Sequence, residues 1–196
     1  ALIVRRGLQV RPAFYAVAGL VVLALPMILS QPTLHAERTF FGVLQVRDIE
    51  DNRRVLKHGT TIHGMQDFTS EAAAREPIGY YGRTGPVGQA FDHLQPSNPF
   101  QHIGIIGLGT GGIAAYGQPG QEMTYYEIDP AVIDIASDPR YFTYLKDSDA
   151  TIHTVAGDGR LELEEVADGS YELLIVDAFS SDAIPMHLLT RVAFEL

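Results

Sequence analysis

The chain has 196 residues, 46% hydrophobic content and no cysteine, so it can bury one moderate core but can form no disulfide, thiolate metal site or cysteine nucleophile. Its 24 acidic and 14 basic side chains give a formal net charge of −10, which disfavours nucleic acid as a partner and is compatible with a cationic substrate. The lack of cysteine leaves the redox compartment open.

The amino end contains an uncharged and almost wholly apolar segment at residues 13–29. Its length is near the lower limit for a bilayer-spanning helix, so we expect a transmembrane helix in preference to a buried soluble helix or a secretory signal. We assign residues 1–35 to this helix and its flanks, which makes the chain membrane-associated. Arg5 and Arg6 precede the helix and, taken alone, would keep the amino end in the cytoplasm and place the rest of the chain on the other side of the membrane. An odd number of upstream helices would reverse that orientation. We expect the domain that follows this helix to lie in the cytoplasm.

Residues 36–67 show the alternation of apolar and polar residues that is typical of a small antiparallel β domain. Strand-like runs at residues 39–48 and 53–58 flank the turn residues Glu50-Asp51-Asn52, and another run follows at residues 60–63. We therefore expect a β domain in front of the main domain.

Residues 68–99 predict a connecting region with a gate loop, a helix and a linker. A brief helix around residues 72–74 ends at Glu76-Pro77, and Pro86 can begin a second helix. Between these helices, Tyr80-Tyr81 lie in a glycine-rich loop.

The strongest signal is a short apolar run at residues 102–106 that ends in a glycine-rich turn. This pattern predicts a buried strand, a turn whose backbone can approach a ligand, and the start of a helix. Twenty residues after the first glycine, Glu127 ends a second apolar strand at residues 123–126. In a doubly wound α/β sheet these strand ends are neighbours, which predicts a nucleoside-binding site at the carboxyl edge. The glycines of the turn are Gly107, Gly109 and Gly111.

Two more predicted strands also end in polar residues. Residues 151–156 lead into Gly157-Asp158, and residues 171–176 lead into Asp177. Because the carboxyl ends of parallel strands meet at one edge of a sheet, we expect the polar chemistry to gather there.

Each acid near this edge has a structural and a functional interpretation. Glu127 is at a distance from the glycines that suits a carboxylate accepting hydrogen bonds from both ribose hydroxyls, in preference to a plain strand-end acid. Asp158 can accept a hydrogen bond from an adenine amino group or simply stabilise a turn. Asp177 follows four consecutive apolar residues, Leu173 to Val176, so we expect the perturbed pKa of a general base. Asp129 is assigned to helix capping, and Asp182 taken alone is a helix-entry acid.

Together these motifs resemble the spermidine synthases, the polyamine aminopropyltransferases, from Arg38 to the end of the chain. With the apolar segment before them, they are similar in particular to the membrane-fused, spermidine-synthase-like branch. Each motif is shared with many S-adenosylmethionine-dependent enzymes, but their joint order is fairly specific. In chain order the motifs are His58-Gly59-Thr60-Thr61-Ile62-His63-Gly64-Met65-Gln66, Tyr80-Tyr81, Gly107-Leu108-Gly109-Thr110-Gly111-Gly112, Tyr126-Glu127-Ile128-Asp129-Pro130, Gly157-Asp158 and Asp177-Ala178-Phe179-Ser180-Ser181-Asp182-Ala183-Ile184-Pro185.

The resemblance implies an α/β fold: a Rossmann-like S-adenosylmethionine-dependent methyltransferase fold over residues 100–196, truncated at the C-terminus. The small antiparallel β domain and the N-terminal hydrophobic helix would precede it. The co-substrate would be decarboxylated S-adenosylmethionine, or S-adenosylmethionine itself, and no metal would take part. A diamine such as putrescine would attack the propyl methylene of the sulfonium. Homodimerisation through the β domain is a further family expectation.

The resemblance also assigns roles to individual residues. The catalytic set is Asp177, Asp182 and Tyr80, in which Asp177 would orient and deprotonate the attacking amine. The cofactor-binding set is Gly107, Gly109, Gly111, Glu127, Asp158 and Gln66. The amine channel is lined by Gln66, Tyr80, Tyr81 and Asp177.

The sequence departs from the family's pattern in places. The family's glycine loop carries an acid that holds an amino group of the substrate, and the residue at that position here is the neutral Thr110. Asp177 and Asp182 lie farther apart than the family's two late acids. The last strands of such a sheet are expected beyond Leu196.

Other functions would use the same residues. A small-molecule methyltransferase would use the same glycines and Glu127, and a non-catalytic nucleoside- or polyamine-sensing domain of a membrane protein would need binding alone. NAD binding is a weaker alternative, since the β domain and the Gly157-Asp158 pair argue against it. His58, His63 and His102 have no metal-ligand spacing with acids, so a structural role is favoured.

Overall fold

The structure is a computed structural model that describes residues 15, 19–20, 33–95, 100–179 and 185–194. The chain divides into a unit of residues Ala1–Pro32 and a unit of residues Thr33–Leu196, and the second unit is treated below. Most of the predicted helix at residues 13–29 lies outside the described residues, as does Asp182. Within the described part of the chain, no helix has both the length and the apolar character needed to cross a bilayer.

The β domain is a four-stranded antiparallel sheet with its strands in chain order. It begins at Thr33, earlier than the predicted start, and the first residues of the predicted run at 39–48 form a turn, so that the second strand begins at Val43. The first strand lacks an apolar alternation because it is an edge strand with only His35 half-buried. Asp51 and Asn52 form the expected tight turn, with φ angles of 62° and 54°. The strands are β1 (Thr33–Arg38), β2 (Val43–Ile49), β3 (Arg53–His58) and β4 (Thr61–Asp67).

The connecting region contains the two predicted helices. α2 (Glu71–Arg75) begins where the Ser70 hydroxyl accepts a hydrogen bond from the amide of Ala73, and α3 (Pro86–Leu94) has proline in its first turn. The 3₁₀ helix η1 (Gly79–Tyr81) lies between them.

Gln66 joins β4 to the connecting region and to the main domain. Its side chain is fully buried, and its amide nitrogen donates to the Ala74 carbonyl at 2.7 Å and to the Thr143 hydroxyl at 2.8 Å. Its amide oxygen accepts from the backbone of Thr143 at 2.9 Å. The amide is therefore held within the protein by donors and acceptors on both sides.

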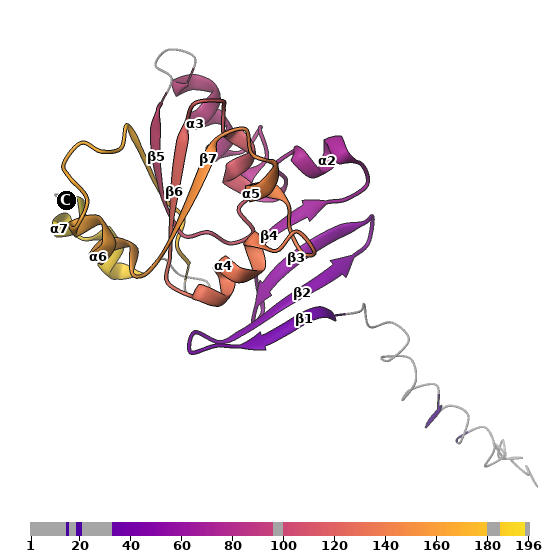
Figure 1. The fold of residues 1–196 in the computed structure, drawn as a ribbon. Helices are drawn as coiled ribbons and strands as arrows, with labels where there is room; N and C mark the ends of the chain where they lie inside the picture. Colours follow the sequence, from indigo (N-terminus) through magenta and orange to yellow (C-terminus); the bar gives the residue numbers. More distant parts are fainter. Residues whose placement is uncertain (1–14, 16–18, 21–32, 96–99, 180–184, 195–196) are drawn as a thin grey trace, which may run out of the picture. The chain divides into compact units, whose positions relative to one another are not determined.

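The main domain is built on a parallel sheet in the order β7-β6-β5-β8, which confirms the predicted parallel α/β topology. The chain first builds outward from β5 through β6 to β7, and then returns to place β8 on the other side of β5 (Figure 1). The carboxyl ends of β5 and β8 therefore flank a switch point, where such sheets bind ligands. The strands are β5 (His102–Ile106), β6 (Glu122–Glu127), β7 (Thr151–Ala156) and β8 (Leu173–Val176).

Short helices connect these strands. The predicted helix after the glycine turn is a single 3₁₀ segment, η2 (Gly112–Tyr116), which ends at Gly117. Asp129 caps α4 as expected, since its carboxylate accepts from the amide of Ala131 at 3.1 Å. The remaining helices are α4 (Pro130–Ser137), α5 (Tyr144–Asp147), α6 (Gly159–Glu164), η3 (Met186–Leu189) and α7 (Arg191–Phe194).

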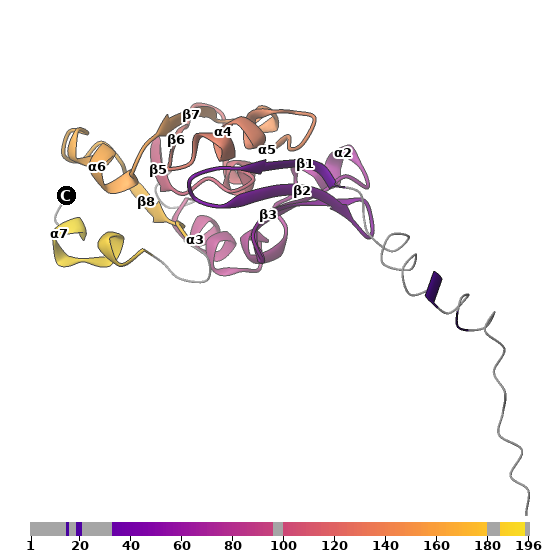
Figure 2. The ribbon, with the colours of Figure 1, turned by 90° about the horizontal axis from the view of Figure 1, so that it is seen from below.

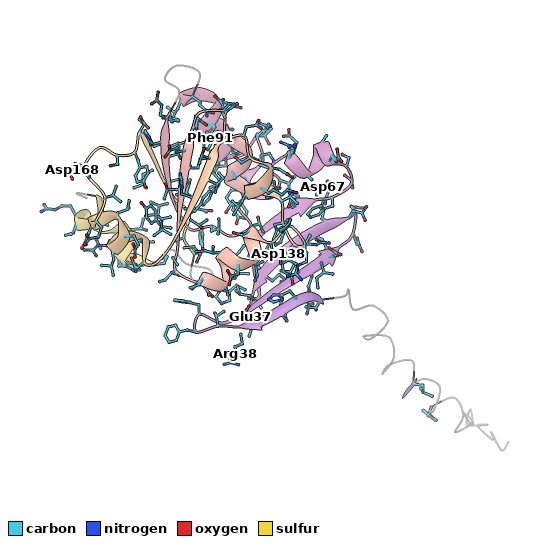
Figure 3. All side chains as sticks on the ribbon, in the orientation of Figure 1. Glu37, Arg38, Asp67, Phe91, Asp138 and Asp168 are labelled. Atoms are coloured by element: carbon cyan, nitrogen blue, oxygen red, sulfur yellow. The ribbon has the colours of Figure 1, made fainter. Side chains whose placement is uncertain are left out.

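The two sheets share one hydrophobic core. Leu44 and Leu56 of the β domain belong to the same buried cluster as Ile103 and Ile105 of the central strand, and the sheets lie side by side in both ribbon views (Figures 1 and 2). Phe91, which α3 contributes to this cluster, is buried and is labelled beside α3 in Figure 3. Packing between the two sheets therefore fixes the β domain against the carboxyl edge of the parallel sheet.

We predict that Gln66→Ala lowers the free energy of unfolding by about 2–4 kcal/mol, because it leaves a cavity and unpaired groups in the core. Urea denaturation followed by circular dichroism would measure the loss. Gln89→Ala, at an exposed position of α3, should change the same quantity by less than about 0.5 kcal/mol. Equal effects of the two substitutions would contradict a structural role for Gln66.

Candidate functional site

A cavity of about 270 Å³ lies at the carboxyl edge of the parallel sheet, between that edge and the β domain. One wall consists of residues that follow β5, β6, β7 and β8, and the opposite wall comes from β2, β3, β4 and η1. The polar and aromatic residues of the lining are Phe41, His58, His63, Tyr80, Tyr81, Tyr126, Glu127, Asp129, Asp158, Asp177, Phe179 and His187.

The glycine turn brings backbone close to the cavity. Gly107 and Gly109 both line it. Their backbone φ angles are 97° and 56°, a region that residues other than glycine rarely adopt. A Cβ on Gly107 would lie 2.5 Å from the carbonyl oxygen of Asp177, so the turn also requires glycine for packing. Gly111 is placed differently, because it packs against Leu145 at the start of η2 and does not line the cavity.

Glu127 is buried at the cavity wall. One carboxylate oxygen accepts from the amide of Leu108 at 3.0 Å and the other from the amide of Asp129 at 3.0 Å. Burial raises the pKa of Glu127, and these two backbone donors oppose that shift. The carboxylate is thus fixed in orientation, and each oxygen keeps a lone pair for another donor.

Asp158 also lines the cavity and has partners of its own. One oxygen caps α6 by accepting from the amide of Arg160 at 2.9 Å, and the other lies 3.1 Å from Nε2 of His187. Asp158 therefore has a structural role as a helix cap, and it also lines the cavity.

Asp177 is the carboxylate of the site whose pKa is raised most clearly. Burial raises its pKa to about 6, and a hydrogen bond donated by the Tyr81 hydroxyl acts in the opposite direction. Burial also raises the pKa of Tyr81, so this phenol keeps its proton and remains a donor. Tyr80 packs on Tyr81 with ring centroids 4.2 Å apart and is itself half exposed. The site therefore contains a carboxylate that can gain or lose a proton near neutral pH.

Most of the predicted site residues meet at this cavity: Gly107, Gly109, Glu127, Asp158, Asp177, Tyr80 and Tyr81. Gln66 does not line it, because its amide is used by Ala74 and Thr143 in the core. The predicted roles of Gln66 in cofactor and amine binding are therefore not supported by its position. Asp182 lies outside the described residues.

Sequence reasoning missed the wall contributed by the β domain. Phe41, Leu44 and Leu56 line the cavity together with His58 and His63. The alternation of apolar and polar residues in β2 and β3 indicated that each strand has one buried face. Only the packing of the two sheets against each other shows that this face closes the cavity. Among the described residues, no three histidine or acidic side chains converge as they would around a metal ion.

Comparison with known proteins supports the resemblance inferred from the motifs. No family model matches the chain. A polyamine aminopropyltransferase of Vibrio vulnificus (strain CMCP6) is 36% identical over 96 residues, which cover 46% of this chain and 31% of the relative. The chain thus spans about a third of the length of this curated relative.

Two solved structures have a similar fold. A spermidine synthase from Thermotoga maritima matches with a TM-score of 0.54 and 17% identity, covering 81% of this chain and 50% of that one. A spermidine synthase in complex with the transition-state analogue AdoDATO matches with a TM-score of 0.56 and 16% identity over the same shares of each chain. The resemblance to polyamine aminopropyltransferases is thereby confirmed, and the narrower resemblance to a membrane-fused branch stays a prediction.

We predict that Asp177→Asn stabilises the fold in a pH-dependent way. A carboxyl with a higher pKa in the folded chain contributes stability that is complete below about pH 4 and is lost as the pH rises through about 6. The variant and the wild type should therefore have the same free energy of unfolding near about pH 4. Above about pH 7 the free energy of unfolding of the variant should be higher by about 1–3 kcal/mol. Urea unfolding across this range would measure the difference, and a difference independent of pH would refute the raised pKa.

Proposed function

We propose that this chain forms the nucleoside-binding part of an aminopropyltransferase, in which the aminopropyl group of decarboxylated S-adenosylmethionine passes to a diamine such as putrescine. The observation that carries the proposal is the position of Asp177, a carboxylate of raised pKa in the same cavity as Glu127 and the glycine turn. The similarity to a polyamine aminopropyltransferase supports this choice among nucleoside-binding enzymes.

The cavity has the features that an adenosine group requires. Gly107 and Gly109 place main chain at the cavity wall, and the fixed carboxylate of Glu127 suits two ribose hydroxyls. Asp158 lies at the cavity wall beside His187, where an adenine amino group could reach its carboxylate. Phe179 and Leu188 supply apolar surface at the same wall.

Asp177 would act as the base. An ammonium has no lone pair for attack, so its proton must leave before nitrogen bonds to the methylene carbon next to the sulfonium. As the new C–N bond forms, the C–S bond breaks, its electrons neutralise the sulfonium, and 5′-methylthioadenosine leaves. A carboxylate with a pKa of about 6 accepts that proton more readily than an exposed aspartate would, and the Tyr81 hydroxyl orients it. The sulfur is already a good leaving group, so positioning supplies most of the remaining catalysis.

A methyltransferase acting on a small molecule is the second candidate. It is favoured by Thr110, a neutral and buried residue at the position where the resemblance leads us to expect an acid. Calorimetry with S-adenosylmethionine and its decarboxylated form separates the two candidates, since preference for the carboxylated compound would reject aminopropyl transfer.

We predict that Asp177→Asn lowers kcat for aminopropyl transfer by about 10²- to 10⁴-fold, the usual contribution of a positioned base. Mass spectrometry of the spermidine formed from decarboxylated S-adenosylmethionine and putrescine would measure it. Asp168→Asn is the matched control, because Asp168 is exposed at the periphery of the molecule (Figure 3). Wild-type binding of the nucleoside without any product, unaffected by Asp177→Asn, would instead favour a sensing domain.

We predict that Glu127→Gln weakens binding of 5′-methylthioadenosine by about tenfold or more, because the amide cannot accept from both backbone donors and two ribose hydroxyls. Isothermal titration calorimetry would measure the dissociation constant. Glu122→Gln, at the opposite and exposed end of the same strand, should leave it unchanged. Similar affinities for both variants would remove the ribose role from Glu127.

A further inference from the structure

An irregularity in the β domain brings His63 to the cavity. Leu56 of β3 pairs with Gly64 of β4, but the next residue, Lys57, pairs with Ile62, so His63 is the extra residue of a β-bulge. Gly64 has a backbone φ of 143°, which residues other than glycine rarely adopt. Bulges redirect side chains beside functional sites, and the His63 ring lines the cavity with Tyr80 and Tyr81.

The imidazole of His63 has hydrogen-bonding capacity that the protein leaves unused. Its Nε2 is buried and has no hydrogen-bond partner among the described residues. The neighbouring His58 ring lies 5.5 Å away between centroids, and its own Nε2 is within 2.7 Å of the Phe41 carbonyl. Burial lowers the pKa of His63, with a smaller contribution from His58, so the ring is neutral at neutral pH and can accept a hydrogen bond.

His63 also lies beside the glycine turn. A Cβ on Gly109 would be 2.2 Å from the His63 carbonyl oxygen, so the two backbones are in contact. Thr110 cannot supply the acid that the resemblance predicts, and its hydroxyl is directed at Gly64, where a Cβ would be 2.3 Å away. The His63 main chain therefore borders the turn while its side chain lines the cavity, and the Tyr81 hydroxyl lies near the same turn.

We propose that His63 is a specificity-determining residue, whose neutral imidazole accepts a hydrogen bond from the terminal amino group of the aminopropyl donor. This inference rests on the proposed function, because it concerns the tail of the same nucleoside ligand. The amino group that an acid would hold from within the glycine loop is held here from the β-bulge. The bond adds affinity for the tail and does not affect the adenosine.

Two ligands that share the nucleoside test this assignment. Decarboxylated S-adenosylmethionine carries the amino group, and 5′-methylthioadenosine lacks it. By calorimetry we expect the wild type to bind the first at least tenfold more tightly. In His63→Leu that ratio should fall to about threefold or less while the affinity for methylthioadenosine stays the same, which also shows that the variant is folded. His63→Gln keeps an acceptor and should retain most of the ratio.

His102→Gln is the control, because His102 is exposed at the amino end of β5, and it should alter neither affinity. An unchanged ratio in His63→Leu overturns the role of His63 and leaves the proposed function intact. A loss of affinity for both ligands alike would show a structural role only, and overturns it too. If His63→Leu weakens S-adenosylmethionine more than its decarboxylated form, the imidazole donates to a carboxylate and the proposal is wrong. A wild type that binds neither nucleoside would overturn the proposed function, and this inference with it.

Discussion

Direct backbone contact at the glycine turn is the constraint on which the rest of the site depends. Gly107 meets the carbonyl of Asp177 on one side, and Gly109 meets the carbonyl of His63 on the other, both at separations that exclude a Cβ. The turn thus touches the residue that follows β8 of the parallel sheet and the bulged strand of the β domain together. A side chain at either position would push apart the walls of the cavity.

The acids of the cavity differ in the hydrogen-bond donors that hold them. Glu127 and Asp129 accept backbone amides, and Asp158 caps α6 through a backbone amide, so each of these carboxylates is oriented by at least one main-chain donor. Asp177 instead accepts from the Tyr81 hydroxyl, and burial keeps its pKa near 6. A carboxylate with few donors in a desolvated place is the one suited to receive a proton.

Much of this arrangement could be predicted from the sequence, because its signals are local. The strands at residues 102–106 and 151–156 were bounded correctly by their apolar runs, and the capping role of Asp129 followed from the proline after it. The first β strand was missed because an exposed edge strand shows no alternation. Gln66 was assigned to the ligand, but its environment depends on Ala74 and Thr143, which the sequence alone does not bring together. The bulge at His63 depends on register between two strands, which a single strand's pattern cannot reveal.

The spatial relation between Glu127 and Asp177 is set by main-chain hydrogen bonds. The amide of Asp177 donates to the Ile106 carbonyl at 2.8 Å, and the amide of Gly107 donates to the Tyr126 carbonyl at 2.8 Å. The first residues after β5 and β8 are therefore tied across the same strand ends that carry Glu127. The Asp177 backbone therefore keeps a fixed relation to Glu127 and the turn, and the orientation of its carboxylate depends on side-chain rotation. The hydrogen bond from Tyr81 restrains that rotation, which explains why a residue far away in sequence, on the connecting region, completes a site built by parallel strands.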